Sequence, residues 1–257
     1  MEETKTLIYD GSFNGFLTAI FFAFEENANS IIIQKNSNKS NGLFSNTCII
    51  FTDMKKAQDV WQTIQSKNNA AIKNIYFAFL SENKNIENQL FLYIKNLFNP
   101  YIASQIGYSI SMQINLENFA QTVSREKKYL EKTIEFKSAK DGIYYANIAP
   151  ENDILPLLSK YFRLKNNNES WLIFDVKRNY GIYYNLFGIE VISIDTSQIS
   201  NYKTNTSTST NKGVNQKITI LNKYFQLNNI NTLVLNKLHT SNLCNSLSIK
   251  NTKRVAI

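Results

Sequence analysis

The spacing of apolar residues changes near residue 131, and this change limits the possible folds more than any other feature. Before it, apolar residues recur every three or four positions, which predicts helices over 54–66, 70–80 and 115–130. After it, apolar residues alternate in short runs up to residue 195, as they do in strands. We therefore expect an α+β fold, in which an N-terminal strand and a helical region precede a mainly antiparallel sheet with flanking helices.

The first 26 residues predict a strand, a tight turn and a buried helix. A short apolar run ends at Asp10, Gly11 and Ser12, and a segment that is apolar on most faces follows over 14–26. Gly11 allows a backbone with positive φ, and Ser12 can accept a hydrogen bond from the first helical turn. Such a turn either caps the helix or binds a phosphate, and the residues leave both alternatives open. We expect the opening strand to join the later sheet.

The second half of the chain carries the strand signals. Lys140-Asp141-Gly142 separates two alternating runs, and a DG turn in that position predicts a hairpin. Further strands are expected over 171–174, 181–184 and 189–194. These short strands, with turns between them, are typical of an antiparallel sheet.

Composition suggests how the chain is divided. A single α+β domain is predicted over 1–195, with its helical part at about 14–130 and its sheet part at about 131–195. Residues 196–216 are rich in Ser, Thr and Asn and have little to bury, so they predict a linker. A small tail with a helix is expected over 217–257.

The chain of 257 residues has a net charge of +8, with 28 Lys and Arg against 20 Asp and Glu. A basic surface favours polyanions such as nucleic acid or an anionic membrane. An organism whose proteins are generally rich in Lys and Asn would produce the same excess without any such partner. Charge alone therefore makes nucleic acid a candidate partner.

Few residues suit metal chemistry. Cys48 and Cys244 are the only cysteines and His239 is the only histidine, so the chain lacks the ligands for an iron–sulfur cluster or a multi-histidine metal site. We expect no metal and no cofactor. The two separated cysteines favour a reducing cytoplasm, and the polar first five residues predict no signal peptide. The apolar stretch in 14–26 is too short to cross a bilayer.

Two basic clusters are candidates for contact with nucleic acid. Arg125, Lys127 and Lys128 are expected near the end of a helix, where they either offset the helix dipole or contact phosphates. Lys177 and Arg178 are expected at a turn between two strands, which is the second cluster.

Aromatic residues follow the second cluster. Tyr180, Tyr183 and Tyr184 lie close to Lys177 and Arg178 in the sequence, so the turn can hold a phosphate while a tyrosine stacks on a base. The alternative is a solvated turn beside tyrosines of the sheet. Because side chains alternate along a strand, Tyr183 and Tyr184 point to opposite faces, and we expect at most one of them in a core.

Three carboxylates lie beside these basic residues in the sequence. Asp175 either forms a salt bridge with Lys177 or Arg178 or orients a base. Glu151 and Asp153 follow Pro150 and are expected to cap the next helix. No pair of carboxylates has a spacing that requires metal binding or hydrolysis.

Four blocks carry a resemblance to a known family: YDGSFNGFLTAIFFAFEE, TDMKKAQDVWQTI, IYFAFLSENKNIENQLFLYIKNLF, and DGIYYANIAPENDILPLLSKYF together with WLIFDVKRNYGIYY. Over about residues 6–195 the chain resembles a bacterial family of DNA-metabolism and DNA-repair proteins that contains a domain of unknown function. Members of that family are encoded beside a radical-SAM protein for DNA modification or repair. In other bacteria the same domain is fused ahead of a uracil-DNA-glycosylase-like domain.

This chain departs from the family pattern at several basic positions. Relatives carry a His-Arg pair where this chain has Lys128 and Tyr129, and an aromatic and a basic residue where it has Thr133 and Glu135. The basic-aromatic motif at the end of relatives is replaced by residues 242–247. We interpret the chain as a divergent member, in which contacts to nucleic acid at these positions are weaker or different.

The resemblance and the charge together imply a cytoplasmic DNA-metabolism or DNA-repair accessory protein that binds DNA and acts with a radical-SAM protein encoded nearby. One alternative is an adaptor that binds a protein through its helices at 54–98 and does not contact DNA. Another is an enzyme that acts on a base or a phosphodiester through Asp10, Asp175 or a tyrosine. The scarcity of His and Cys argues against the enzyme.

Overall fold

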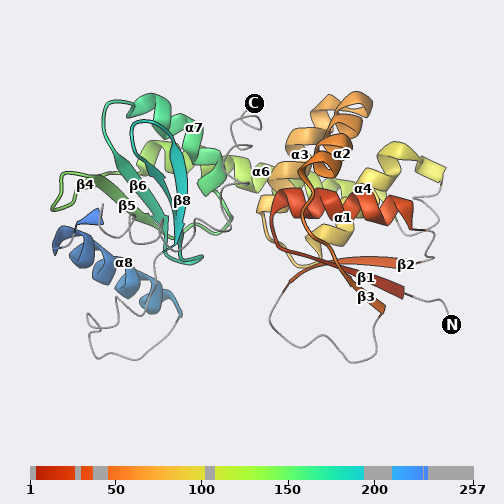
Figure 1. Cartoon of the computed structure of the whole chain (residues 1–257), viewed down its shortest axis with the longest axis horizontal. Helices are drawn as coiled ribbons and strands as arrows, with labels where there is room; N and C mark the ends of the chain where they lie inside the picture. Colours follow the sequence, from red (N-terminus) through yellow and green to blue (C-terminus); the bar gives the residue numbers. More distant parts are fainter. Residues whose placement is uncertain are drawn as a thin grey trace. The chain divides into compact units, whose positions relative to one another are not determined.

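The computed structural model describes residues 4–26, 30–36, 46–101, 108–193, 210–227 and 229–230. The chain divides into two compact units, residues 1–125 and 126–257, called here unit 1 and unit 2. Each unit has its own sheet, and helices pack against it, so the fold is α+β as predicted (Figure 1). Among the described residues, no helix combines the length and apolar character that crossing a bilayer requires.

The opening strand belongs to a small parallel sheet in unit 1. Strands β1 (Thr4–Tyr9), β2 (Ser30–Lys35) and β3 (Asn46–Ile49) lie in the order β2-β1-β3, and both pairs are parallel. The prediction that this strand joins the later sheet is therefore wrong. The reason is the helix α1 (Phe13–Glu25), which returns the chain from β1 to β2 as the crossover of a βαβ unit.

Helices bury the sheet of unit 1. Figure 1 shows α1 lying along the three strands, and about half of its residues are buried. The apolar positions predicted for 54–66 also face the core, because Ala57, Val60 and Ile64 of the second helix are all buried. The remaining helices of this region are α2 (Met54–Lys67), α3 (Asn69–Leu80), α4 (Ile86–Phe98) and α6 (Ile110–Thr133), the last of which continues into unit 2.

A side chain of α4 completes the free edge of β2. The Ile33 amide donates to Asn88 Oδ1 at 2.9 Å, and Asn88 Nδ2 donates to the Ile33 carbonyl at 3.4 Å. The Asn88 amide thus takes the place of a neighbouring strand at this position. The buried N–H and C=O groups of Ile33 are both hydrogen-bonded as a result. This contact fixes α4 against the sheet.

Unit 2 is built on a five-stranded sheet in the order β4-β5-β6-β7-β8, and only the pair β5/β6 is parallel. The expected DG hairpin is confirmed between β4 and β5, where Gly142 has a φ of +81° and its amide donates to the Ala139 carbonyl at 3.1 Å. The strands are β4 (Lys137–Ser138), β5 (Tyr144–Ile148), β6 (Trp171–Asp175), β7 (Tyr180–Tyr184) and β8 (Ile189–Ser193).

Helices α7 (Leu155–Lys165) and α8 (Thr210–Leu227) both pack on this sheet. Phe162 of α7 contacts Trp171, which in turn contacts Tyr184. Tyr183 belongs instead to the cluster of buried residues that includes Phe225 of α8. Tyr183 and Tyr184 are therefore both buried, and the prediction that at most one of them lies in a core is wrong. The prediction failed because helices cover both faces.

Helix α8 begins inside the range predicted as a linker, so residues 210–216 are helical. Residues 194–209 and 231–257 lie outside the described residues, and so does most of the predicted linker and tail, with His239 and Cys244. The predicted domain boundaries stay a prediction.

We expect Phe225→Ala to lower the free energy of unfolding by about 3 kcal/mol, because the deleted ring is fully buried against Tyr145. Leu227→Ala is the matched control on the same helix: its side chain is 52% exposed, and its loss should cost less than about 0.5 kcal/mol. Urea unfolding measures both. Equal stability of the two variants would contradict the packing of α8 on the sheet.

Candidate functional site

The turn after β1 is held by its own side chains. Asp10 Oδ1 accepts hydrogen bonds from the Ser12 amide at 2.9 Å and from Ser12 Oγ at 2.7 Å. Ser12 Oγ accepts in turn from the Gly15 amide at 2.9 Å, which makes Ser12 the N-cap of α1. Gly11 has a φ of +86°, a conformation that glycine adopts at little cost.

A second helix begins at the same end of the sheet. Thr52 Oγ1 donates to Asp10 Oδ2 at 2.8 Å, and Asp53 caps α2 by accepting from the Lys55 amide at 2.9 Å and the Lys56 amide at 3.2 Å. The carboxylates of Asp10 and Asp53 thus accept from the donors that a phosphate would need. Of the two alternatives for the Asp10 turn, these contacts favour capping.

No motif in the sequence indicates that Thr52 or Gly15 belongs to this turn. A Cβ at Gly15 would lie 2.2 Å from Asp10 Oδ1, so only glycine lets the carboxylate approach this closely. Thr52 reaches Asp10 because β3 pairs in parallel with β1 and both strands end at the same edge, which no local pattern in the sequence indicates.

In unit 2, the turn between β6 and β7 is organised around Asp175, whose side chain is completely buried. Its Oδ1 accepts from the Lys177 amide at 2.8 Å and the Arg178 amide at 3.2 Å, and its Oδ2 accepts from Arg178 Nη1 at 2.8 Å. A buried carboxylate needs such a set of donors, because an unpaired charge in the interior is costly. Asp175 therefore pairs with Arg178, which is one of the two partners expected from the sequence.

Arg178 and Lys177 also hold the segment 150–153. Arg178 Nη2 donates to the Glu151 carbonyl at 2.8 Å, and Arg178 Nη1 lies 3.3 Å from the Pro150 carbonyl. Lys177 Nζ donates to Glu151 Oε1 at 2.6 Å, and the bond from Lys177 lowers the pKa of the Glu151 carboxyl. The Glu151 side chain is 85% exposed, so this ion pair contributes little to stability.

The same segment is fixed by two further side chains. The hydroxyl of Tyr180 donates to Asp153 Oδ1, and burial, followed by the charge of Asp153, raises the pKa of Tyr180. The N-cap of α7 is Ile154, which makes no side-chain capping bond. The prediction that Glu151 and Asp153 cap this helix is therefore wrong, because both carboxylates bind residues of the β6–β7 turn and strand β7.

Sequence reasoning missed Glu126, which supports segment 150–153 from helix α6. Its carboxylate accepts from the Glu151 amide at 2.7 Å, from the Asn152 amide at 3.0 Å and from Asn152 Nδ2 at 2.6 Å. Glu126 is surrounded in the sequence by basic residues, and its partners lie 25 and 26 positions away. Only the folded chain brings them together.

The basic cluster of α6 divides into two sets. Lys127 pairs with Glu131 at 2.8 Å. Arg125, Lys128, Tyr129 and Lys132 are spaced as i, i+3, i+4 and i+7, so they share one side of the helix, and all four are exposed. We call these four residues the α6 face. The helix ends at Thr133 and its last turn holds Lys132, so Arg125, Lys127 and Lys128 lie one to two turns before its end.

The structure thus gathers Asp175, Lys177, Arg178 and Tyr180 in one region of unit 2. Asp10, Gly11 and Ser12 form a separate turn in unit 1. Among the described residues, no group of three or more His, Cys, Asp and Glu side chains is arranged to hold a metal ion.

We expect Asp175→Asn to lower the free energy of unfolding by about 3 kcal/mol, because it leaves the charge of Arg178 without its buried partner. Glu169→Gln removes the same charge from an exposed position of unit 2 and should change stability by less than about 0.5 kcal/mol. Chemical unfolding compares them. If Asp175→Asn is as stable as Glu169→Gln, Asp175 does not organise the turn.

No curated protein matches the chain. A family model matches residues 84–246, which is more than half of the chain. The matched range starts just before α4 and includes α6, the α6 face, the sheet of unit 2 and helix α8. The chain therefore belongs to the family described as a domain of unknown function, DUF4130.

Proposed function

We propose that the protein binds nucleic acid through the α6 face. The observation that carries the proposal is that its three cations have no partner within the part of the chain that the structure describes. Arg125, Lys128 and Lys132 make no salt bridge or side-chain hydrogen bond there, whereas Lys127, Lys177 and Arg178 are all paired. Unpaired cations on one side of a helix are the usual means of contacting phosphates.

The distribution of charge supports unit 2 as the binding part. Its sequence holds 18 Lys and Arg against 10 Asp and Glu, whereas that of unit 1 holds 10 of each. The whole net charge of +8 therefore resides in unit 2. Within unit 2, residues 194–257 hold 8 Lys and Arg against 1 Asp. A polyanion is therefore attracted more to unit 2 than to unit 1, which has no net charge.

Tyr129 gives the α6 face a second kind of contact. Its side chain is 65% exposed and lies between the cations, where an aromatic ring can stack on an unpaired base. The face extends about 10 Å along the helix axis, so its cations can follow a short length of backbone. Alternating cations and an aromatic ring suit a single strand better than a duplex, whose bases are stacked inside.

Lys177 is a secondary contact in this proposal. Its ion pair with the exposed Glu151 is weak, and a phosphate can replace it. Arg178 is committed to the buried Asp175, so we assign it a structural role. Tyr180 is likewise bound to Asp153.

The wider role that we propose is that of a cytoplasmic accessory protein in DNA metabolism or repair, acting with a radical-SAM partner encoded nearby. This part rests on the family resemblance. The helices at 54–98 do not favour a separate adaptor function, because none of the large apolar side chains that are exposed in the described residues lies in that range.

Replacing Lys128 and Lys132 together by Ala should weaken binding to a single-stranded oligonucleotide and lower the slope of log K against log salt by about 1.4, because two phosphate contacts are lost. Tyr129→Ala should weaken binding about tenfold and leave the slope unchanged, since stacking releases no counterions. Fluorescence anisotropy at several salt concentrations measures affinity and slope.

The matched control is the double variant Lys55→Ala and Lys67→Ala, which removes two exposed lysines from α2. It should bind as the unchanged protein does. The proposal fails if the control loses as much affinity as the α6 variant, or if Lys177→Ala alone accounts for the salt dependence.

Co-expression with the radical-SAM protein encoded beside this chain should yield a complex that survives affinity purification and gel filtration. Separate elution of the two proteins at micromolar concentration, with both folded, would contradict the partnership. That result would leave the binding of nucleic acid to the α6 face untouched.

A further inference from the structure

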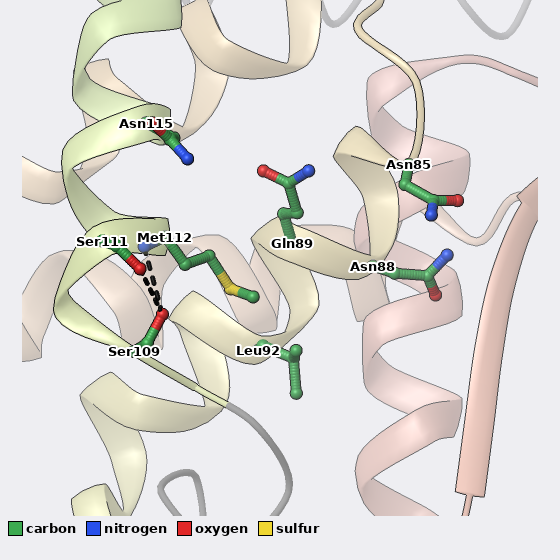
Figure 2. A pocket seen from close by; sticks show the side chains of 8 residues that line it. All are labelled: Asn85, Asn88, Gln89, Leu92, Ser109, Ser111, Met112 and Asn115. Atoms are coloured by element: carbon green, nitrogen blue, oxygen red, sulfur yellow. Dashed lines mark hydrogen bonds between the residues drawn. The ribbon is translucent and has the colours of Figure 1, made fainter.

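Helices α4 and α6 enclose an open hollow of about 420 Å³ in unit 1 (Figure 2). None of the described residues that line it is charged. Amide and hydroxyl side chains make up most of the wall, and Leu92 and Met112 provide its apolar part. In Figure 2, Gln89 extends from α4 and Asn115 from α6 toward the space between the two helices, and Met112 reaches from α6 toward α4.

Three amides of this wall have no partner in the described structure. Asn85, Gln89 and Asn115 make no side-chain hydrogen bond to another residue there. Asn88, which also lines the hollow, differs because both ends of its amide bind the backbone of Ile33. Gln89 and Asn115 extend into the space between the helices and are available to a ligand there, whereas Asn85 points away from it in Figure 2, and Asn88 holds the wall in place.

Asn85 begins helix α4 with an unusual backbone conformation. It is the N-cap of α4, a position where asparagine normally accepts a bond from the first helical turn, yet its side chain makes no capping bond. Its backbone is left-handed, with a φ of +63°. Asparagine adopts this conformation more readily than most residues that carry a Cβ, which accounts for its presence at this turn.

We propose that this hollow binds a nucleobase. A primary amide presents one donor and one acceptor side by side, and this pair matches the donor and acceptor on the edge of a base. Met112 and Leu92 can contact the face of the ring. The lining residues include no cation to offset the charge of a phosphate, and the volume is within the range of small-molecule sites.

The base can belong to a free nucleoside or to an unpaired nucleotide in a strand. Both present the same edge and ring face to the amides. The inference does not rest on the α6 face, because a free nucleoside carries no phosphate.

The test uses the full chain and measures the binding of adenosine, guanosine, cytidine, uridine and thymidine by NMR titration, with ribose as the reference. At least one nucleoside should bind at millimolar concentration or below, and more tightly than ribose. Gln89→Ala should weaken this binding about fivefold, since one hydrogen bond to the ligand is lost. Asn115→Trp should abolish it by filling the hollow.

The matched control is Gln121→Ala, which removes an exposed amide of α6 outside the hollow. It should leave the affinity unchanged, and an unchanged thermal unfolding curve for each variant shows that the fold is intact. The proposal is overturned if no nucleoside binds at 10 mM, because a Kd above about 10 mM is too weak to indicate a specific site. It is also overturned if ribose binds equally well, or if Gln121→Ala weakens binding as much as Gln89→Ala.

A single-stranded oligonucleotide distinguishes the two sources. If Gln89→Ala binds both the nucleoside and the oligonucleotide more weakly, the natural ligand is a base within a strand. If it binds only the nucleoside more weakly, the ligand is a free nucleoside. The double variant of Lys128 and Lys132 should leave nucleoside binding unchanged, so failure of the α6 face and failure of the hollow are separate results.

Discussion

The buried carboxylate of Asp175 determines the contacts of Lys177 and Arg178, the two basic residues of the β6–β7 turn. A charge without access to water needs donors on all sides, and Asp175 takes two backbone amides and the guanidinium of Arg178. These hydrogen bonds hold the β6–β7 turn in place, and they keep the guanidinium of Arg178 bound to Asp175. Through Arg178 and Lys177 the turn also holds segment 150–153. Arg125, Lys128 and Lys132 of α6 make no ion pair within the described part of the chain.

Helix α6 contributes to both structure and proposed function. Glu126 points to one side of the helix and binds the amides of Glu151 and Asn152. The α6 face lies on another side, because the midpoint of residues 125, 128, 129 and 132 is about 110° away from residue 126 around the helix axis. One helix thus anchors the segment that follows β5 and presents free cations to solvent.

Local sequence patterns predicted the helices and strands. Contacts between residues far apart in the sequence determined how the strands pair and which side chains are buried. The helical stripe at Ala57, Val60 and Ile64 and the DG hairpin at Gly142 are local signals, and both are present in the structure. The pairing of β1 with β2 depends on the crossover through α1. The burial of Tyr183 depends on α8, whose first residues have the composition of a linker.

The candidate sites likewise depend partly on local sequence patterns and partly on contacts between distant residues. The spacing of Arg125, Lys128 and Lys132 is visible in the sequence, but their freedom from ion pairs is visible only in the structure. The partners of Glu126 and of Asn88 lie too far along the chain for any motif to reveal them.

The most direct test of nucleic-acid binding by the α6 face is an NMR titration of the isotopically labelled protein with a short single-stranded oligonucleotide. The amide shifts of residues 125–132 should change most, with smaller changes near Lys177. Added salt should reverse both changes. Shifts that spread evenly over the lysines of both units, or that omit α6, would contradict binding by the α6 face.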